Sequence, residues 1–468
     1  MNTDTPSHQK SSTFGKDSAM SLIHHDRIER IAADTLAPYA GNARTHSKKQ
    51  IKQIADSIAR FGFTNPVLID DGNGIIAGHG RVLAAKSLGM ADVPCLRLSH
   101  LSEADKRAYV LADNKLALNA GWDKGLLAVE LQALVDADYS VEVTGFSIGE
   151  VDTVIQEASA AAPDGSDAPE DATPKPAAVA VTKPGDVWQL GRHRLVCGDA
   201  QVAEAYVALL AGEPVDAIFT DPPYNVPIDG HVSGLGATKH REFAFAAGEM
   251  SKEAFTAFLA TTLGHAAAAA RDGAIAFVCM DWRHMGDLIA AGEAVFSELK
   301  NVCVWNKTNG GMGTFYRSKH EMVFVFKVGN APHTNTFGLG DEGRYRTNVW
   351  DYAGVNTMKK GRMDELGMHP TVKPVALVAD ALLDVTRRGA VVLDPFGGSG
   401  STLIAAEKTG RSARLIEFDP LYCDVIIRRF EAFTGKRAQL AATGETFENV
   451  AAERSAASEE MVAVDVVA

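Results

Sequence analysis

Hydrophobic positions change their spacing several times along the first third of the chain. Apolar residues recur at helical spacing within residues 47–61, which predicts an amphipathic helix. Short apolar runs over residues 65–69 and 75–77 predict two strands, with a turn of Asp, Asn and Gly between them. Residues 81–88 again predict a helix, which a glycine ends. This mixture predicts a small α+β domain over residues 23–155.

A second pattern, in which apolar strand-like runs alternate with helical segments, extends over residues 185–440. Such alternation predicts an α/β domain with helices on both faces of a doubly wound, Rossmann-like sheet. Residues 156–184 are acidic, rich in Ala and Pro and almost free of large apolar side chains, which predicts an extended, solvated linker. The polar residues 1–22 predict a disordered leader, and the acidic residues 441–468 predict a loose tail.

Length and composition narrow the class of protein. The chain has 468 residues, which fits two or three globular domains. No apolar run reaches the roughly 18 residues of a membrane helix, and the polar start has no signal core, so we expect a cytoplasmic protein without a membrane span. The scattered cysteines form no CxxC pair, which predicts free thiols and no metal site. They are Cys95, Cys197, Cys279, Cys303 and Cys423.

The net charge of −13 at first argues against a nucleic-acid partner, because phosphate binding needs Lys and Arg. The charge is unevenly placed. Residues 150–186 carry a net −6 and residues 441–468 a net −5, which leaves the rest of the chain close to neutral. Residues 305–373 carry a net +4. Binding to DNA is therefore compatible with the composition.

The first chemical pattern follows the apolar strand predicted over residues 215–220. The strand ends in Asp221, Pro222, Pro223 and Tyr224. Proline cannot continue a central strand, so the chain turns at its carboxyl end, where open α/β sheets bind ligands. A carboxylate, rigid carbonyls and an aromatic ring side by side suit a planar ligand with an exocyclic amine. A simple strand terminator with a buried tyrosine is the alternative.

A glycine-rich turn is the second pattern, between a strand that ends at Asp394 and a helix over residues 403–409. Its glycines allow close approach to a ligand, and the helix start favours an anionic group such as a carboxylate. A third strand ends at Glu417, about 20 residues beyond the glycine turn, where a carboxylate can accept from ribose hydroxyls; a solvated carboxylate at a strand end is the alternative. In the fourth pattern, His-Pro-Thr-Val-Lys-Pro, Thr371 and Lys373 could hold a carboxylate; a capping loop with a surface lysine is the alternative.

Together the four patterns resemble the DNA amino-methyltransferases that use S-adenosylmethionine, over residues 185–432. The catalytic motif precedes the cofactor motif, as in the β class of that family. The resemblance implies the following site residues: Asp221, Pro222, Pro223 and Tyr224 are catalytic, and Asp199, Thr371, Lys373, Asp394, Phe396, Gly397, Gly398, Gly400 and Glu417 bind the cofactor.

The resemblance also implies a mechanism on double-stranded DNA. The target base is flipped out and stacks on Tyr224, while Asp221 and the Pro222 carbonyl accept from its exocyclic amine. Neither a metal nor a covalent nucleophile is needed. Aspartate before Pro-Pro-Tyr favours site-specific adenine-N6 methylation, of the restriction–modification kind, over cytosine-N4 methylation. Target recognition would fall within residues 337–367. Candidate DNA contacts there are Lys359, Lys360 and Arg362, and a solvated surface is the alternative.

The N-terminal domain resembles the ParB/sulfiredoxin-like domain over residues 23–134. Members of that family bind a nucleotide through the turn that here reads Gly78, His79, Gly80 and Arg81. ParB turns are richer in Glu and Arg, which argues against nucleotide hydrolysis here, and a DNA-docking or scaffold module remains an alternative. A different class of function also stays open, a nucleotide-gated DNA-binding protein whose methyltransferase fold is only a scaffold. Whether the protein acts as a homodimer is likewise open.

Overall fold

The computed structural model describes residues 27–137, 139–159, 169–226, 248–307, 315–336, 346–353 and 372–456. The chain divides into two units, residues 1–147 and 148–468, and each is described by itself. The boundary lies eight residues before the predicted one at residue 155, because helix α5 belongs to the second unit. That helix covers Ile148–Ser159.

The first unit is a four-stranded sheet with helices around it. The strand order is β1-β4-β2-β3, and only β4 and β2 pair in parallel. Ser47 accepts the backbone N–H of Gln50 and caps α1, which ends at Gly62 with a left-handed φ of 81°. The four predicted elements are confirmed within a few residues, as α1 (Lys48–Phe61), β2 (Val67–Ile69), β3 (Ile75–Ala77) and α2 (His79–Ser87). The other elements were not predicted individually, and they are β1 (Glu29–Ala32), β4 (Asp92–Arg97), α3 (Glu103–Leu118) and α4 (Lys124–Asp136).

The second unit is built on one long sheet, which confirms the predicted α/β class. Among the described residues it has ten strands in the order β11-β9-β10-β8-β7-β12-β13-β6-β5-β14. The five neighbours from β8 to β6 run in parallel. The strands are β5 (Val187–Leu190), β6 (His193–Cys197), β7 (Val215–Thr220), β8 (Ala270–Met280), β9 (Glu298–Asn306), β10 (His320–Lys327), β11 (Val349–Asp351), β12 (Val391–Asp394), β13 (Ser412–Glu417) and β14 (Gln439–Leu440).

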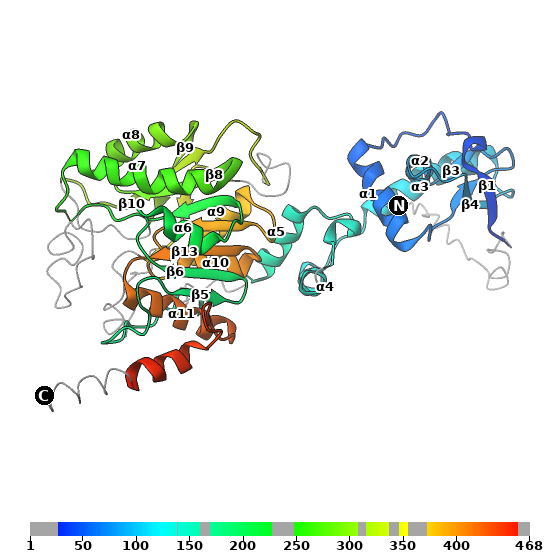
Figure 1. Ribbon diagram of the computed structural model, residues 1–468. Helices are drawn as coiled ribbons and strands as arrows, with labels where there is room; N and C mark the ends of the chain where they lie inside the picture. Colours follow the sequence, from blue (N-terminus) through cyan, green and yellow to red (C-terminus); the bar gives the residue numbers. More distant parts are fainter. Residues whose placement is uncertain are drawn as a thin grey trace, which may run out of the picture. The chain divides into compact units, whose positions relative to one another are not determined.

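Helices cover both faces of this sheet (Figure 1). One apolar cluster packs α6, α7 and α8 against one face, and a second packs α9, α10 and α11 against the other. Each helix buries a stripe of Leu, Ile, Val and Phe, which removes apolar surface from water. The helices are α6 (Ala203–Leu210), α7 (Lys252–Ala269), α8 (Met285–Val295), α9 (Val375–Val385), α10 (Ser401–Thr409) and α11 (Pro420–Thr434).

The two neighbouring strands β7 and β12 mark the point where the chain reverses its direction across the sheet. From β7 the chain passes through α7 to β8 on one side, and from β12 through α10 to β13 on the other. A crevice forms outside the carboxyl ends of such a pair, because the two connections leave in opposite directions. The motifs after β7 and β12 therefore meet.

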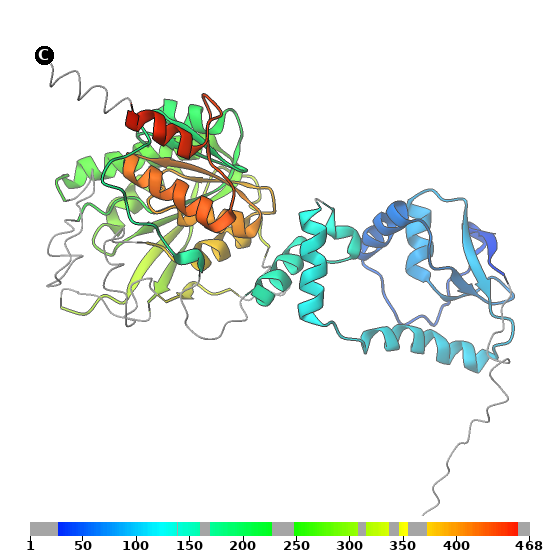
Figure 2. The same ribbon diagram turned by 90° about the horizontal axis from the view of Figure 1, so that it is seen from below.

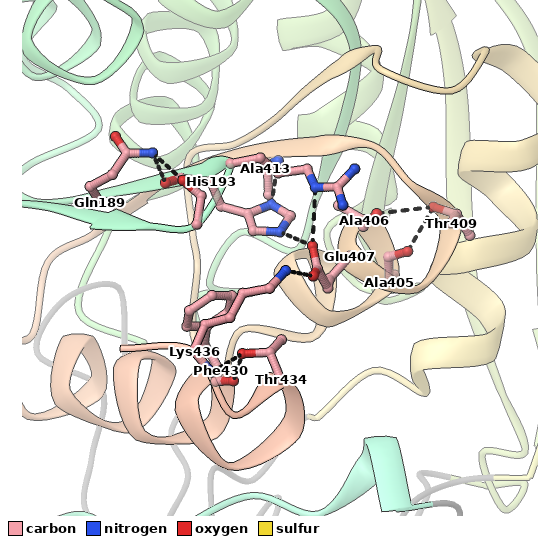
Figure 3. Close-up of polar contacts among 12 residues, drawn as sticks. Gln189, His193, Ala405, Ala406, Glu407, Thr409, Ala413, Phe430, Thr434 and Lys436 are labelled. Carbon is pink, nitrogen blue, oxygen red and sulfur yellow. Dashed lines mark hydrogen bonds and ion pairs between the residues drawn. The ribbon is translucent and has the colours of Figure 1, made fainter. Parts of the chain in front are cut away.

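A buried histidine joins β6, β13, α10 and the end of α11 (Figure 3). The Nδ1 atom of His193 accepts the Ala413 N–H at 2.9 Å, so its Nε2–H donates to Glu407, also at 2.9 Å. Lys436 pairs with the same carboxylate at 2.7 Å. Burial lowers the pKa of His193, and the hydrogen bond from His193 helps to lower the pKa of Glu407 to about 2. This cluster connects β6, β13 and α10 at the amino-terminal ends of the two strands, at the opposite edge of the sheet from their carboxyl ends.

Two segments expected to be solvated are packed instead. In the predicted linker, Asp424 of α11 accepts the N–H groups of Val181 and Thr182, and Thr182 is buried. In the predicted tail, residues 447–456 form a helix, drawn in red beside orange α11 in Figure 2. Phe447 is buried there, with its ring 5.4 Å from that of Trp188. Hydrogen bonds to Asp424 hold the first segment, and the contact between Phe447 and Trp188 holds the second. Neither segment contains the long apolar run by which burial is predicted from sequence.

The five cysteines are buried, and none is joined to another in a disulfide. Burial raises the pKa of Cys95 to about 11 and that of Cys303 to about 12. Helices in the described parts of the chain are all too short or too polar to cross a bilayer.

Candidate active site

Four carboxylates follow the carboxyl ends of four adjacent parallel strands. Asp221 follows β7, Asp394 ends β12, Glu417 ends β13, and Asp199 lies two residues after β6. Parallel strands end at the same edge of a sheet, so residues more than 200 positions apart in the sequence face one crevice. The site is therefore assembled by the strand order.

Asp394 is buried, and its oxygens are occupied by the protein itself. They accept from the hydroxyls of Thr220 at 3.0 Å and Thr402 at 2.6 Å, and from the N–H of Phe396 at 3.1 Å. Burial raises the pKa of Asp394 to about 7. Asp394 thus ties the end of β7 to the start of α10 and shapes the glycine turn between them. Phe396 packs with its ring 5.8 Å from that of Phe258.

The glycines of the turn are needed for packing as well as for the turn itself. A Cβ on Gly397 would lie 3.1 Å from Ile426, and a Cβ on Gly400 would lie 3.2 Å from the same side chain. Gly400 has a φ of +83° and begins α10. The sequence predicted close approach to a ligand, whereas the described contacts show close approach to α11. Only glycine meets both demands at Gly400.

Glu417 presents a buried carboxylate beside this turn. It accepts the N–H of Gly398 at 2.7 Å and that of Asp419 at 2.8 Å. Burial raises the pKa of Glu417 to about 7. One strand away, Asp199 accepts the N–H of Gln201 at 2.8 Å and is only partly buried. Acceptors at these two strand ends fit a ligand that carries hydroxyl and amine donors, such as a nucleoside.

Asp221 lies at the centre of a compact polar cluster. The hydroxyl of Tyr224 donates to its Oδ1 at 2.7 Å, and Nζ of Lys373 contacts its Oδ2 at 2.5 Å. Lys373 was predicted to hold the cofactor, but it lies against Asp221 and, at 3.0 Å, against Glu321. It is buried and forms its ion pairs with these two acids. The fourth motif therefore reaches the catalytic motif in space.

Glu321 and Lys307 were not among the predicted site residues. Lys307 pairs with the second oxygen of Glu321, and its Nζ lies 4.5 Å from the centre of the Trp305 ring. The antiparallel pairing of β9 and β10 sets Glu321 opposite Trp305. This register could not be read from the sequence. The cluster now contains two acids, Asp221 and Glu321, and two lysines, so its formal charges balance.

The pKa values follow from this balance. Burial raises the pKa of Asp221, and Lys373 opposes that rise. Burial also disfavours the charge on Glu321, but the two lysines prevail and lower its pKa to about 2. Glu321 therefore stays ionised and holds Lys373 in place, while Asp221 is the more readily protonated of the two acids.

In the first unit, the Gly-His-Gly-Arg turn begins α2. Gly78 has a φ of 101° and caps the helix, and Nε2 of His79 accepts the N–H of Tyr39 at 3.1 Å. Arg81 is partly buried, and its guanidinium donates to the carbonyl of Pro66 at 3.3 Å. A Cβ on Gly80 would lie 3.0 Å from Ile54 of α1. Two of the four predicted residues, His79 and Gly80, thus serve the packing of the turn.

Several predicted residues lie outside the described part of the chain, namely Thr371, Lys359, Lys360 and Arg362. Within the expected recognition region, residues 346–353 are described. Arg346 pairs there with Asp384 of α9 at 3.0 Å, and Trp350 is buried. This piece belongs to the scaffold.

The sequence matches three known families in succession. These are described as ParB N-terminal domain over residues 17–115, ParB-methyltransferase HTH domain over residues 125–184 and DNA methylase over residues 215–428. The second match spans the boundary between the two units, which lies between residues 147 and 148. Helix α4 lies before this boundary and helix α5 after it, and the match covers both.

Three individual proteins illustrate these matches. ParB-like nuclease domain-containing protein YnaK of Escherichia coli (strain K12) is 57% identical over 72 residues, which are 15% of this chain and 83% of that protein. Type II methyltransferase M.HpaI of Haemophilus parainfluenzae is 25% identical over 258 residues, 51% of this chain and 74% of that protein. The crystal structure of the M1.HpyAVI–SAM complex is 19% identical, with a TM-score of 0.37, and covers 50% of this chain and 97% of that one.

Proposed function

Because this chain belongs to the ParB-domain proteins that carry a DNA methyltransferase of the N6/N4 family, we propose that it methylates N6 of adenine in double-stranded DNA. The methyl donor is S-adenosylmethionine. The observation that carries the proposal is the position of Asp221 at the end of β7, beside Tyr224 and next to the strand that leads into the glycine turn.

The residues of the crevice fall into two groups, those that bind the cofactor and those that orient the amine of the target base. Glu417 and Asp199 fit the hydroxyl and amine donors of the cofactor, since both are carboxylates at the correct edge of the sheet. Bound S-adenosylmethionine would supply an electrophilic methyl group. Asp221 and the Pro222 carbonyl accept hydrogens from the exocyclic amine, which directs the nitrogen lone pair toward that methyl. Asp221 can also take up the proton that the amine loses on methylation.

Tyr224 has two tasks in this proposal. Its ring provides the surface on which a flipped-out base stacks, and its hydroxyl orients Asp221. Lys373 favours the ionised form of Asp221, and Glu321 holds Lys373. All of these groups act by position and charge, so no covalent intermediate with the protein is required.

The product identifies the base. We expect unmethylated DNA incubated with the protein and S-adenosylmethionine, then digested to nucleosides, to contain N6-methyldeoxyadenosine. N4-methyldeoxycytidine in its place would establish the cytosine alternative. Absence of both, together with nucleotide-dependent binding of DNA, would favour the DNA-binding protein with a scaffold methyltransferase fold.

Replacement of Lys373 by methionine should shift the pH dependence of the reaction. The nearest positive charge is lost, so the pKa of Asp221 rises further. The ionised carboxylate accepts the hydrogen bonds from the amine, so activity is present above the pKa of Asp221 and lost as pH falls through it. The acidic limb of the kcat–pH profile should therefore move to higher pH. Lys436→Met, which removes the ion pair with Glu407, is the control and should leave the profile unchanged. An unshifted profile in Lys373→Met would contradict the proposed effect of Lys373 on Asp221.

We also propose that the Gly-His-Gly-Arg turn binds a nucleotide phosphate. A left-handed glycine opens the helix, and Nε of Arg81 is buried without a hydrogen-bond partner among the described residues. Arg81→Ala should weaken the binding of a nucleoside triphosphate by at least about tenfold in calorimetry. Arg60→Ala, which removes a contact with Tyr139 elsewhere in the unit, should leave it unchanged. If Arg81→Ala and the wild type bound the nucleoside triphosphate with equal affinity, the turn would be a docking or scaffold element.

A further inference from the structure

The end of the second family match, between α5 and β5, contacts two elements that carry residues of the active site. A short helix, η4 (Pro169–Asp171), lies in the stretch that the sequence predicted to be solvated. Oδ1 of Asp171 accepts the N–H of Val375 at 2.9 Å. Val375 begins α9 and follows Lys373 by two residues. Asp171 therefore caps the helix that carries the lysine paired with Asp221.

The same segment also reaches the glycine turn through one buried arginine. Arg429 of α11 is 2% exposed. Its Nη1 donates to the carbonyl of Ser399 in the turn at 2.9 Å, and its Nη2 donates to the carbonyl of Glu170 at 2.8 Å. The turn, α11 and η4 are thus connected through a single guanidinium.

Charge explains why an aspartate stands at position 171. Burial lowers the pKa of Arg429 to about 10, and Asp171 is the acid whose charge opposes this effect. An arginine buried without a nearby anion is unfavourable. Asp171 thus stabilises the charge that holds the Ser399 carbonyl, and its own oxygen holds the start of α9.

We propose that Asp171 is a positioning residue, which acts through Arg429 on the glycine turn of the cofactor site and through Val375 on the segment that carries Lys373 to Asp221. The inference rests on the proposed function in one respect, the identity of the cofactor. It assigns a part in the reaction to the segment that the sequence predicted to be a solvated linker.

The test compares three variants of the full chain. Asp171→Ala removes both the cap and the charge, and should weaken S-adenosylmethionine binding about tenfold by calorimetry, as expected for the loss of a hydrogen bond to a charged group. The KM for S-adenosylmethionine should rise by the same factor, while the KM for DNA stays within twofold. Asp171→Asn keeps an acceptor for the Val375 N–H but loses the charge, and should fall between the wild type and Asp171→Ala.

Asp186→Ala is the matched control. Asp186 likewise accepts a backbone N–H, from Lys183 at 2.7 Å, and pairs with an arginine, Arg454. Its loss should lower the melting temperature but leave cofactor affinity within twofold. If Asp171→Ala also lowered only the melting temperature, or if Asp171→Asn bound the cofactor as tightly as the wild type, Asp171 would be a structural brace and the inference would be wrong.

Calorimetry separates this inference from the proposed function. A wild type that binds S-adenosylmethionine but methylates no DNA would overturn the function and leave the binding comparison decisive. A wild type that binds no S-adenosylmethionine would overturn both.

Discussion

Asp221→Ala is expected to lower the rate of methyl transfer at least about 100-fold, a loss of the size seen when one preorganised electrostatic contact to a transition state is removed. Without the carboxylate, the exocyclic amine keeps its lone pair in the ring conjugation and is not aimed at the methyl group. Affinity for S-adenosylmethionine should change little, because the acceptors assigned to the cofactor are Asp199, which follows β6, and Glu417, which ends β13. Single-turnover methylation and calorimetry measure the two quantities.

The control for this variant lies at the other end of the same strand. Asp216 pairs with Arg271 at 2.8 Å and accepts the N–H of Val391 at 2.7 Å. Asp216→Ala removes comparable contacts far from the crevice and should lower stability while the rate of a folded sample stays near that of the wild type. Full transfer by Asp221→Ala would show that the catalytic assignment is wrong. If the variant lost only its affinity for S-adenosylmethionine, Asp221 would have to be assigned to cofactor binding.

The largest effect on stability is expected from Asp152→Ala in α5. Asp152 is 5% exposed and pairs with Arg388 at 2.8 Å and with Arg411 at 3.2 Å. Arg411 is fully buried, so its charge would lose its acidic partner. Removing one partner of a buried ion pair costs about 3–5 kcal/mol. A fall of roughly 5–10 °C in the melting temperature of the second unit should follow.

Arg411→Met provides the comparison. Methionine fills a similar volume without a charge, and Asp152 keeps its ion pair with Arg388. This variant should therefore lose less stability than Asp152→Ala, although it has lost the larger and more deeply buried side chain. If the two losses were equal, packing rather than uncompensated charge would govern this contact. The double variant should be no less stable than Asp152→Ala alone, since the arginine left uncompensated is then absent.

The sequence was sufficient to predict the parts of the site that depend on strand ends. An apolar strand that stops at Asp-Pro-Pro identifies Asp221, and a strand that runs into glycines identifies Asp394. Both follow from local rules, namely that proline ends a central strand and that glycine permits a left-handed turn. Neither rule depends on the distant parts of the chain.

The parts that escaped prediction depend on long-range register or on polar burial. Glu321 joins Lys373 only because β9 and β10 form an antiparallel pair beside β8. The supposed linker looked solvated because it lacks large apolar residues, but Asp171 within it accepts the N–H at the start of α9, and the carbonyl of Glu170 accepts from the buried Arg429. Composition predicts which segments bury apolar side chains. It does not predict which charged side chains form ion pairs or hydrogen bonds with residues far away in the sequence.

The burial of all five cysteines makes the protein convenient for site-directed spectroscopy. Thiols in such surroundings react slowly with maleimides, since the reagent needs an accessible thiolate. A single cysteine introduced at an exposed position, such as Val207 on α6 or Leu116 on α3, should be labelled selectively without removal of the native ones. One label on each unit would then make their separation, and its response to nucleotide or DNA, measurable by energy transfer in the otherwise unaltered chain.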